Sequence, residues 1–565
     1  MLPTWALLGR SAVVDRSGDT HKPWTGLLSI CSASALGLLL LQYWPVWQPR
    51  WKKLPPGNSG WPFLIGHTLN LLGDLGAWLQ SMHERYGPAF RCCICGMPAV
   101  CVDCDTYDRC LAKLDGSAQF VPLWPSGFQA LLGDNALQFL LAGSGQRGAR
   151  HRRLKRKVGD ALTVNELRKF LPRIEEIMDR EFKDMVAETA RDGQTSLMPH
   201  CMRIVKTVIL ELVLGPDGIR AEEYQQDTSK ILLDGMIAAP IDLGRCTAYG
   251  RAMTVRRNYH RDVERQRAAA VKAALQGALE SEKPDGWQTI LTRLAKDCEH
   301  GAGLSIEEMQ DMLISLLFGG SLTTAETMQW LTCEVYRHTD WFERLTKEQR
   351  NLRDQADASP AGLKSIWAAP EGKRSPCPES LLACYETLRL HCPIDVLLRS
   401  VEEPVDLGGD LGTIPAGWWV AVHLTERGKK LGPEFNPDRW IDRAAASEVH
   451  AFGLGPHFCV GRHLALWELQ IFLHTWLTRY NIEILSDEIY HQTGLKRFKG
   501  GMPVKVTAQT PEDLCTGEEE RSESSRLSET PEAATLLKQG SGLSITTTLP
   551  SVNFGSEISC SSSDN

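Results

Sequence analysis

A ten-residue stretch late in the chain surrounds one cysteine with three glycines and a proline: Phe452-Gly453-Leu454-Gly455-Pro456-His457-Phe458-Cys459-Val460-Gly461. A helical pattern over residues 462–480 follows it at once. A thiol where a helix begins meets the positive end of the helix dipole and unpaired backbone N–H groups, which favour its thiolate. A thiolate can ligate a metal or act as a nucleophile, and glycines let the backbone approach a flat cofactor closely. The alternative role is that of a small core residue, which is commoner for an unpaired cysteine.

The spacing of this stretch resembles the heme-binding loop of cytochromes P-450, Phe-x-x-Gly-x-Arg-x-Cys-x-Gly, at Phe452, Gly455, Cys459 and Gly461. The resemblance implies that Cys459 is the axial ligand of the iron in heme b and that the other three matched residues also contact that cofactor. His457 stands where the family has an arginine that pairs with a heme propionate. Because histidine titrates near neutrality and arginine does not, we expect heme retention to be weaker or pH-dependent.

Two further motifs stand upstream of this loop in the family's order. Glu386 and Arg389 are three residues apart, so on a helix they share one face and can pair. They resemble the family's Glu-x-x-Arg, whose charges join a downstream arginine, supplied here by Arg439. The resemblance implies a buried network of these three charges that supports the fold and takes no part in the chemistry.

Helical patterns dominate the middle of the chain, and strand-like segments lie near residues 88–104 and 396–422. A long central helix is predicted to begin at Ser305, because Glu308 three residues later completes a capping box, and to continue to about Tyr336. We therefore predict a mainly α fold with small β-sheets, which the resemblance identifies as the cytochrome P-450 fold, preceded by an N-terminal transmembrane helix.

The central helix is interrupted by small and hydroxyl-bearing residues, Gly319-Gly320-Ser321-Leu322-Thr323-Thr324. The family opens an oxygen-binding groove at the corresponding Ala/Gly-Gly-x-Asp/Glu-Thr-Thr, so the resemblance gives Gly320, Thr323 and Thr324 a catalytic role. Leu322 replaces the acid that relays protons to bound O2. A leucine cannot carry a proton, which puts ordinary oxygen activation in question unless water substitutes. The alternative interpretation is that these small residues serve only the packing of the helix against its neighbours.

A basic cluster occupies residues 148–157, and the family has Trp-x-x-x-Arg at this place, matched by His151 and Lys155. The resemblance implies that these two residues face a heme propionate. The remaining charges would suit an acidic electron-donor protein, although a solvated helix face explains them equally well. The net charge of −7 argues against a nucleic-acid partner.

Composition and local pattern divide the 565 residues into five parts. Residues 1–24 form an extension, and 25–47 carry no charge and end in aromatic residues, as a membrane anchor does. A basic, proline-rich hinge (48–57) leads to the heme domain (54–509), and an acidic, Ser-rich tail (510–565) is predicted to be disordered. Basic residues flank the anchor equally, so the cytosolic placement of a single-pass protein of the endoplasmic reticulum comes from the resemblance alone.

Six of the 17 cysteines lie between Cys92 and Cys110. The spacings Cys93-x-Cys95 and Cys101-x-x-Cys104 are not the usual paired Cys-x-x-Cys of a zinc site. The stretch alternates like a hairpin, and unpaired cysteines are commonly buried. We therefore expect strand packing, with zinc as the alternative.

The motifs look most like the branch of the family that holds retinoic-acid, brassinosteroid and abscisic-acid hydroxylases. This resemblance implies a monooxygenase that uses O2 and electrons passed from NADPH by a separate reductase. Its substrate would be a hydrophobic, isoprenoid, sterol or fatty-acid-like molecule under the apolar segment 120–141, which contains Trp124 and Phe128. A heme-thiolate isomerase or hydroperoxide-rearranging enzyme and a non-catalytic heme sensor remain the alternatives.

Overall fold

The computed structural model describes residues 53–57, 66–68, 70, 73–94, 97–124, 126–142, 148–216, 228–238, 240–275, 288–299, 304–358, 367, 375–442, 449–492 and 495–510. All of them up to Ala508 belong to one compact unit, Met1–Ala508, and the last two belong to a second, Gln509–Asn565. The predicted anchor at 25–47 and the tail after 510 lie outside the described residues. Among the helices that are described, none has the length and apolar character required to cross a membrane.

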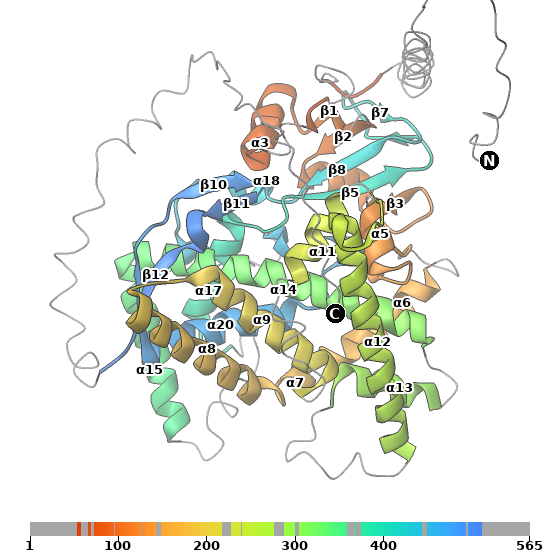
Figure 1. Ribbon diagram of the computed structural model, residues 1–565. Helices are drawn as coiled ribbons and strands as arrows, with labels where there is room; N and C mark the ends of the chain where they lie inside the picture. Colours follow the sequence, from red (N-terminus) through yellow and green to blue (C-terminus); the bar gives the residue numbers. More distant parts are fainter. Residues whose placement is uncertain are drawn as a thin grey trace, which may run out of the picture. The chain divides into compact units, whose positions relative to one another are not determined.

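Helices dominate the unit, as predicted (Figure 1). Their bounds are α3 Leu75–Tyr86, α4 Cys104–Thr106, α5 Ser126–Leu132, α6 Ala149–Ala161, α7 Val164–Leu167, α8 Leu171–Asp192, α9 Leu197–Leu214, α11 Thr228–Ile237, α12 Ala248–Leu275, α13 Ile290–Glu299, α14 Ile306–Arg337, α15 Thr339–Asp357, α17 Pro378–Leu390, α18 Glu426–Lys429 and α20 Arg462–Arg479. Short turns of 3-10 or π helix add η2 Tyr107–Leu111, η3 Leu137–Phe139, η5 Gly244–Cys246, η8 Pro437–Trp440, η9 His450–Phe452, η10 Gly455–His457 and η11 Lys499–Gly501.

The strands form one sheet of five and three smaller sheets. Their bounds are β1 Ala89–Ile94, β2 Met97–Val102, β3 Phe120–Pro122, β4 Thr195–Ser196, β5 Val396–Val401, β6 Val405–Asp406, β7 Thr413–Ile414, β8 Trp419–His423, β9 Tyr480–Ile484, β10 Ile489–Gln492, β11 Leu495–Phe498 and β12 Pro503–Ala508. The five-stranded sheet has the order β1-β2-β8-β5-β3, and its only parallel pair among the described strands is β2 with β8. Both predicted strand regions are therefore confirmed.

The cysteine-rich stretch is a hairpin within this sheet. β1 pairs with β2 in antiparallel register, from Ala89 opposite Val102 to Ile94 opposite Met97. The side chains of Cys92 and Cys101 are buried, and burial raises the pKa of both thiols. Across the described residues, no three histidine, cysteine or acidic side chains gather as a metal would require. Cys92, Cys93 and Cys101 therefore pack within strands, as predicted, whereas Cys104 and Cys110 lie on α4 and η2.

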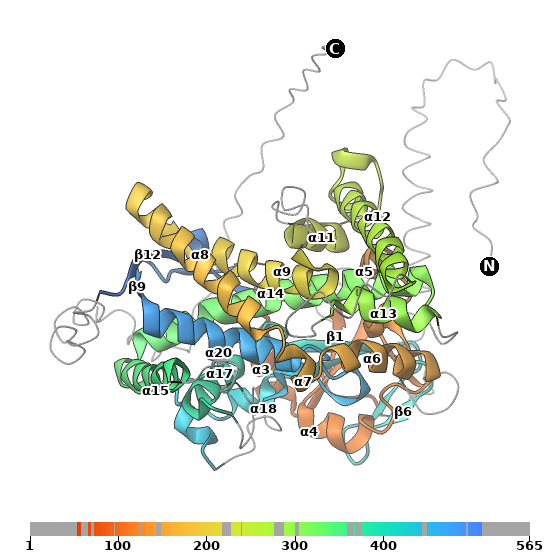
Figure 2. The same ribbon diagram turned by 90° about the horizontal axis from the view of Figure 1, so that it is seen from below.

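The long helix α14 passes through the helical part, with α9 on one side and α20 on the other (Figure 2). Its start is the predicted one: the Ser305 hydroxyl accepts from the Glu308 N–H at 3.1 Å, and the Glu308 carboxylate accepts from the Ser305 N–H at 3.2 Å. Most of its side chains are buried in the largest hydrophobic core, which it shares with α9 and α20. This burial on several sides makes α14 the rigid centre of the fold.

Glu386, Arg389 and Arg439 meet as one network. The Arg389 guanidinium donates to both Glu386 oxygens at 2.8 and 2.9 Å, and Arg439 Nε donates to Glu386 Oε1 at 2.9 Å. The side chains of Glu386 and Arg389 are completely inaccessible to solvent. Trp440 Nε1 and the Asn436 N–H also donate to the same carboxylate, at 2.7 and 2.9 Å. Arg389 reaches carbonyl groups of the segment 428–434 as well, so the network ties α17 to the chain that leads into the cysteine loop.

Candidate functional site

The cysteine loop is a compact turn between η9 and α20. The Cys459 N–H donates to the Phe452 carbonyl at 2.8 Å, which closes the loop on itself. Gly453 and Gly455 hold φ angles of 79° and 61°, a left-handed region that a side chain would strain. The Arg462 guanidinium lies 5.6 Å from the centre of the Phe452 ring. These contacts fix the position of the cysteine just before the first turn of α20.

The Cys459 side chain is accessible although it lies deep in the protein. Burial raises the pKa of its thiol. The backbone N–H groups of Gly461 and Arg462 point at the sulfur and act in the opposite direction, together with the charges of Lys155 and Arg462. The predicted preference for the thiolate is therefore opposed by burial and supported by these groups.

The loop and α6 are joined by two residues that the sequence singles out. Lys155 Nζ donates to the carbonyls of Pro456 and Phe458 at 2.6 and 2.8 Å. His151 is buried, and its ring centre lies 4.7 Å from that of His457. In this structure Lys155 therefore binds the loop backbone itself, while His151 and His457 stand side by side.

His457 is not the neutral-range titrating group that its sequence suggests. Burial is the largest cause that lowers its pKa to about 3, and the charge of Arg399 and the neighbouring His151 act in the same direction. Without a cofactor the ring is therefore uncharged at neutral pH, and weaker or pH-dependent heme retention at this position stays a prediction. Its Nε2 atom is buried and has no hydrogen-bond partner in the described part of the chain.

A buried ion pair beside the loop was missed by sequence reasoning. Arg399 on β5 donates to Asp115 at 2.9 and 3.3 Å, and the Tyr107 hydroxyl donates to the same carboxylate at 2.6 Å. Gly455 packs against this pair, since a Cβ atom on it would lie 2.9 Å from the Asp115 oxygen. Arg399 and Asp115 are 284 residues apart, and the one available signal was an arginine within an apolar strand pattern.

The face of α14 that carries the predicted catalytic residues borders open space. A Cβ atom on Gly319 would meet no neighbour within 4 Å, whereas one on Gly320 would lie 3.4 Å from Ile209 of α9. Thr323 is partly exposed and its hydroxyl donates to the Gly319 carbonyl at 2.9 Å, but Thr324 is buried. The three predicted residues therefore do not lie alike: Thr323, like Gly319, borders the open space, whereas Gly320 and Thr324 pack into the protein.

Apolar rings from the segment 120–141 lie next to this face. The Phe128 ring is 6.3 Å from that of Phe318, in an edge-to-face arrangement. Trp124 is 5.3 Å from Phe128, and Gln138 accepts a hydrogen bond from Ser315 of α14 at 2.8 Å. The segment thus gives the open space an apolar wall.

The residues around Cys459 fit a flat iron-bearing cofactor such as heme. The accessible Cys459 side chain could bind iron through its sulfur, and Cβ atoms on Gly453 and Gly461 would meet nothing closer than 3.9 Å. The unpartnered His457 Nε2 is a polar atom available to a cofactor substituent. Lys155 and Arg399 place two cations near the same loop.

Comparison with known proteins agrees with this geometry. Residues 55–497 match the family model described as Cytochrome P450. The chain is 25% identical to abscisic acid 8'-hydroxylase 1 of Arabidopsis thaliana over 81% of its own length and 92% of the relative's. It is 27% identical to cytochrome P450 85A1 of Brachypodium distachyon, with 79% and 91% covered, and 26% identical to ent-kaurenoic acid oxidase 1 of Arabidopsis thaliana, with 77% and 86% covered.

A solved structure shares the fold. It is a cyanobacterial CYP120A1 with retinoic acid bound, which superposes with a TM-score of 0.63 at 22% identity and covers 81% of this chain and all of that one. The match of the family model over most of the chain, together with hydroxylase relatives, establishes the family and the type of enzyme. The chain belongs to the cytochrome P450 family and is a monooxygenase.

Proposed function

We propose that this enzyme inserts one atom of O2 into an isoprenoid, sterol or fatty-acid-like substrate, with Cys459 as the thiolate ligand of heme b. The observation that carries the proposal is the accessible side chain of Cys459, on a loop closed by the hydrogen bond of its own N–H. When bound, heme supplies the iron that activates O2, and a thiolate ligand favours cleavage of the O–O bond. The protein supplies the ligand, the apolar site and the path for protons.

In this proposal Phe452, Gly455 and Gly461 shape the cofactor's surroundings. His457 offers Nε2 to a heme propionate as a neutral group, with His151 beside it. Lys155 holds the carbonyls of the cysteine loop, and its positive charge supports a negatively charged sulfur. Thr323 would bear the accessible hydroxyl on the α14 side of the site, with Gly320 and Thr324 packed into the protein beside it.

The substrate class is supported by the apolar wall and by the relatives' names. Phe128 and Phe318, the residue before Gly319 in α14, meet edge to face and carry no charge. Relatives are named for abscisic acid and ent-kaurenoic acid, and the solved neighbour holds retinoic acid. A hydrophobic isoprenoid acid is thus the first substrate class to assay.

Electrons come, in this proposal, from NADPH through a separate reductase. Arg152 and Arg156 are exposed on α6, the helix that contacts the cysteine loop through Lys155. Such charges suit an acidic docking face on the donor. Residues 25–47 would anchor the enzyme in the endoplasmic reticulum with the catalytic domain in the cytosol.

The test is a carbon-monoxide difference spectrum of the reduced protein, for the wild type and Cys459→Ala. The thiolate-type band should be present in the wild type and lost in C459A, while Cys246→Ala, which removes an exposed thiol elsewhere, should keep it. A C459A protein with the wild-type band would refute the assignment of the ligand.

Leu322 is the observation that favours a second function, a hydroperoxide-rearranging enzyme, since that reaction needs no relay of protons to O2. Wild-type enzyme supplied with reductase, NADPH and a panel of isoprenoid acids should form hydroxylated products. Product from a hydroperoxide without NADPH would favour the second function instead, and the absence of both reactions would favour a heme sensor.

A further inference from the structure

The side of α14 that carries Leu322 and Thr323 continues one turn beyond the motif Gly319–Thr324. Gly319, Leu322 and Thr323 are partly or fully exposed within a helix that is otherwise mostly buried. Leu322 has no ionisable proton, so a proton for O2 chemistry on this face has to come from another residue or from water. Glu326 follows Leu322 by four residues and Thr323 by three, and this spacing places all three side chains on one face of the helix.

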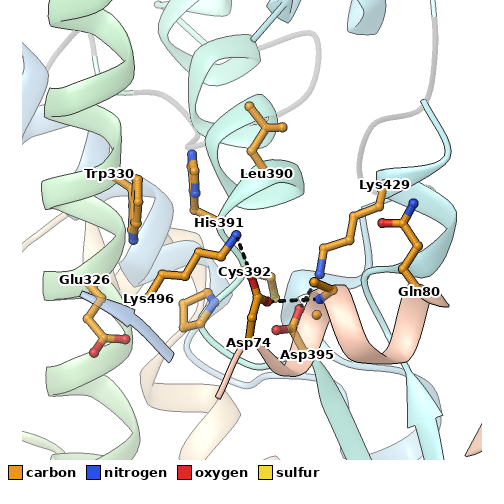
Figure 3. A pocket seen from close by; sticks show the side chains of 13 residues that line it. Asp74, Gln80, Glu326, Trp330, Leu390, His391, Cys392, Asp395, Lys429 and Lys496 are labelled. Atoms are coloured by element: carbon orange, nitrogen blue, oxygen red, sulfur yellow. Dashed lines mark hydrogen bonds and ion pairs between the residues drawn. The ribbon is translucent and has the colours of Figure 1, made fainter. Parts of the chain in front are cut away.

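Glu326 lines a cavity of about 160 Å³ at this end of the face (Figure 3). Trp330, one turn further along α14, lines it too, and His391 and Lys496 face them from other elements. The mouth of the cavity reaches solvent, because the side chains of Lys496 and Asp74 keep 49% and 32% of their accessible surface. Glu326 itself is only 8% exposed, so it lies at the inner end.

The other ionisable groups around the cavity are paired with one another. His391 stacks on Trp330 and contacts Glu334 at 2.7 Å. Asp74 lies 3.5 Å from Lys496 and 3.2 Å from His491. Asp395 accepts from Lys429 at 3.1 Å. These charges are therefore largely compensated where they stand.

Among the described residues, Glu326 has one ionic partner, Arg497, and its side chain is buried. Arg497 Nη2 lies 3.3 Å from Glu326 Oε1, but that oxygen has no hydrogen bond of good geometry in the described part of the chain. Burial raises the pKa of Glu326 to about 7, and the nearby Arg497 offsets only part of that rise. At neutral pH the carboxyl group can therefore both release and recover a proton, which is the property required of a proton donor.

We propose that Glu326 delivers to Thr323 the proton that Leu322 cannot carry, and that the cavity beside it connects Glu326 to solvent. This inference rests on the proposed monooxygenase function. In the step, the carboxyl O–H of Glu326 breaks as its proton passes to Thr323 Oγ1, directly or through one water. Thr323 passes its own hydroxyl proton to O2 in the open space beside Gly319. The Glu326 carboxylate then takes a proton from water in the cavity and the hydroxide so formed leaves to the solvent, so the net change is one proton moved inward and no electron transferred.

The first test needs no turnover. Infrared spectra of the protein should show a protonated carboxyl band that is present at about pH 5 and lost at about pH 9, either side of a pKa of about 7, and absent from Glu326→Gln. The band should shift promptly in D2O because the cavity admits solvent. Glu468→Gln is the matched control, since Glu468 is also buried with a raised pKa but lies on α20. A wild-type spectrum without an E326Q-sensitive band below pH 7, or a band that resists D2O, would overturn the proposal.

The second test measures the reaction. E326Q should lower NADPH-supported product formation by about 10²-fold, the lower end of what a positioned proton donor contributes. Product formation supported by hydrogen peroxide should stay near the wild-type rate, because that reagent brings its own protons. Leu322→Glu, added to E326Q, should restore the NADPH-supported rate.

The role of Glu326 and the monooxygenase function can each be refuted without refuting the other. NADPH-supported rates equal to the wild type in E326Q would overturn the role of Glu326 and leave the monooxygenase function intact. No NADPH-supported product from wild-type enzyme with a normal carbon-monoxide spectrum would overturn the proposed function, and the infrared result would then decide the protonation and solvent access of Glu326. A carbon-monoxide spectrum of E326Q like that of the wild type shows that the variant folds.

Discussion

Replacing Glu386 with alanine should destabilise the protein severely. The change removes the carboxylate that Arg389 and Arg439 both contact, and Arg389 is completely buried. Breaking a buried ion pair by removing one partner costs about 3–5 kcal/mol, because the remaining charge stays in the interior without compensation. This corresponds to a loss of roughly 10²- to 10⁴-fold in the folding equilibrium constant. The Trp440 indole and the Asn436 N–H lose their acceptor as well.

The assay is urea unfolding of the heme-free protein, so that altered cofactor affinity does not contribute to the measured stability. Glu386→Gln keeps hydrogen-bond acceptance but removes the charge, and should fall between the wild type and E386A. Asp487→Ala breaks the exposed pair with Arg337, whose side chains are 48% and 42% accessible, and should change the unfolding free energy by about 1 kcal/mol or less. If E386A lost no more stability than this exposed control, the network would not support the fold as argued.

Two other perturbations give distinct readouts. Gly455→Ala should lower both the heme content and the unfolding midpoint, because φ is 61° and the added Cβ would approach the Asp115 carboxylate at 2.9 Å. Gly408→Ala is the control: φ is 80° there and the added Cβ meets no neighbour within 4 Å, so this variant measures the backbone cost alone, about 1–2 kcal/mol. Burial raises the pKa of Glu175 from 4.5 to about 7, so the folded state binds more protons than the unfolded state in that range and stability should fall as pH rises from 4.5 to 7. Glu175→Gln should reduce this fall in melting-temperature measurements across that range, and an unchanged pH profile would contradict the assignment to Glu175.

Local patterns predicted the parts of the fold that depend on neighbouring residues. The capping box at Ser305 gave the start of α14, because a cap is made by residues three apart. The alternation around the cysteines gave the β1–β2 hairpin for a similar reason. The meeting of Glu386 and Arg389 with Arg439 required the family resemblance, since Arg439 lies 53 residues from Glu386.

The remaining features depend on burial and on distant contacts, which no local pattern shows. The neutral state of His457 follows from its depth in the protein, and the pairing of Arg399 with Asp115 joins two separate elements. Lys155 binds carbonyls of the cysteine loop that are about 300 residues away in the chain. The spacing of four residues between Leu322 and Glu326 is visible in the sequence. The cavity beside Glu326 is not, because it is formed by several elements that are far apart in the chain.

The parallel pairing of β2 with β8 has a consequence for biosynthesis. The Cys104 thiol contacts the carbonyl of His423 at the end of β8, 319 residues later in the chain. At about 5–20 residues per second, a ribosome needs on the order of 15–60 s to synthesise that stretch. During this interval the hairpin has no β8 to cover its edge, so thiols such as Cys101, fully buried in the finished enzyme, are open to oxidants and to labelling reagents. Nascent chains arrested before Trp419 should react with a maleimide at Cys101, and the completed protein should not.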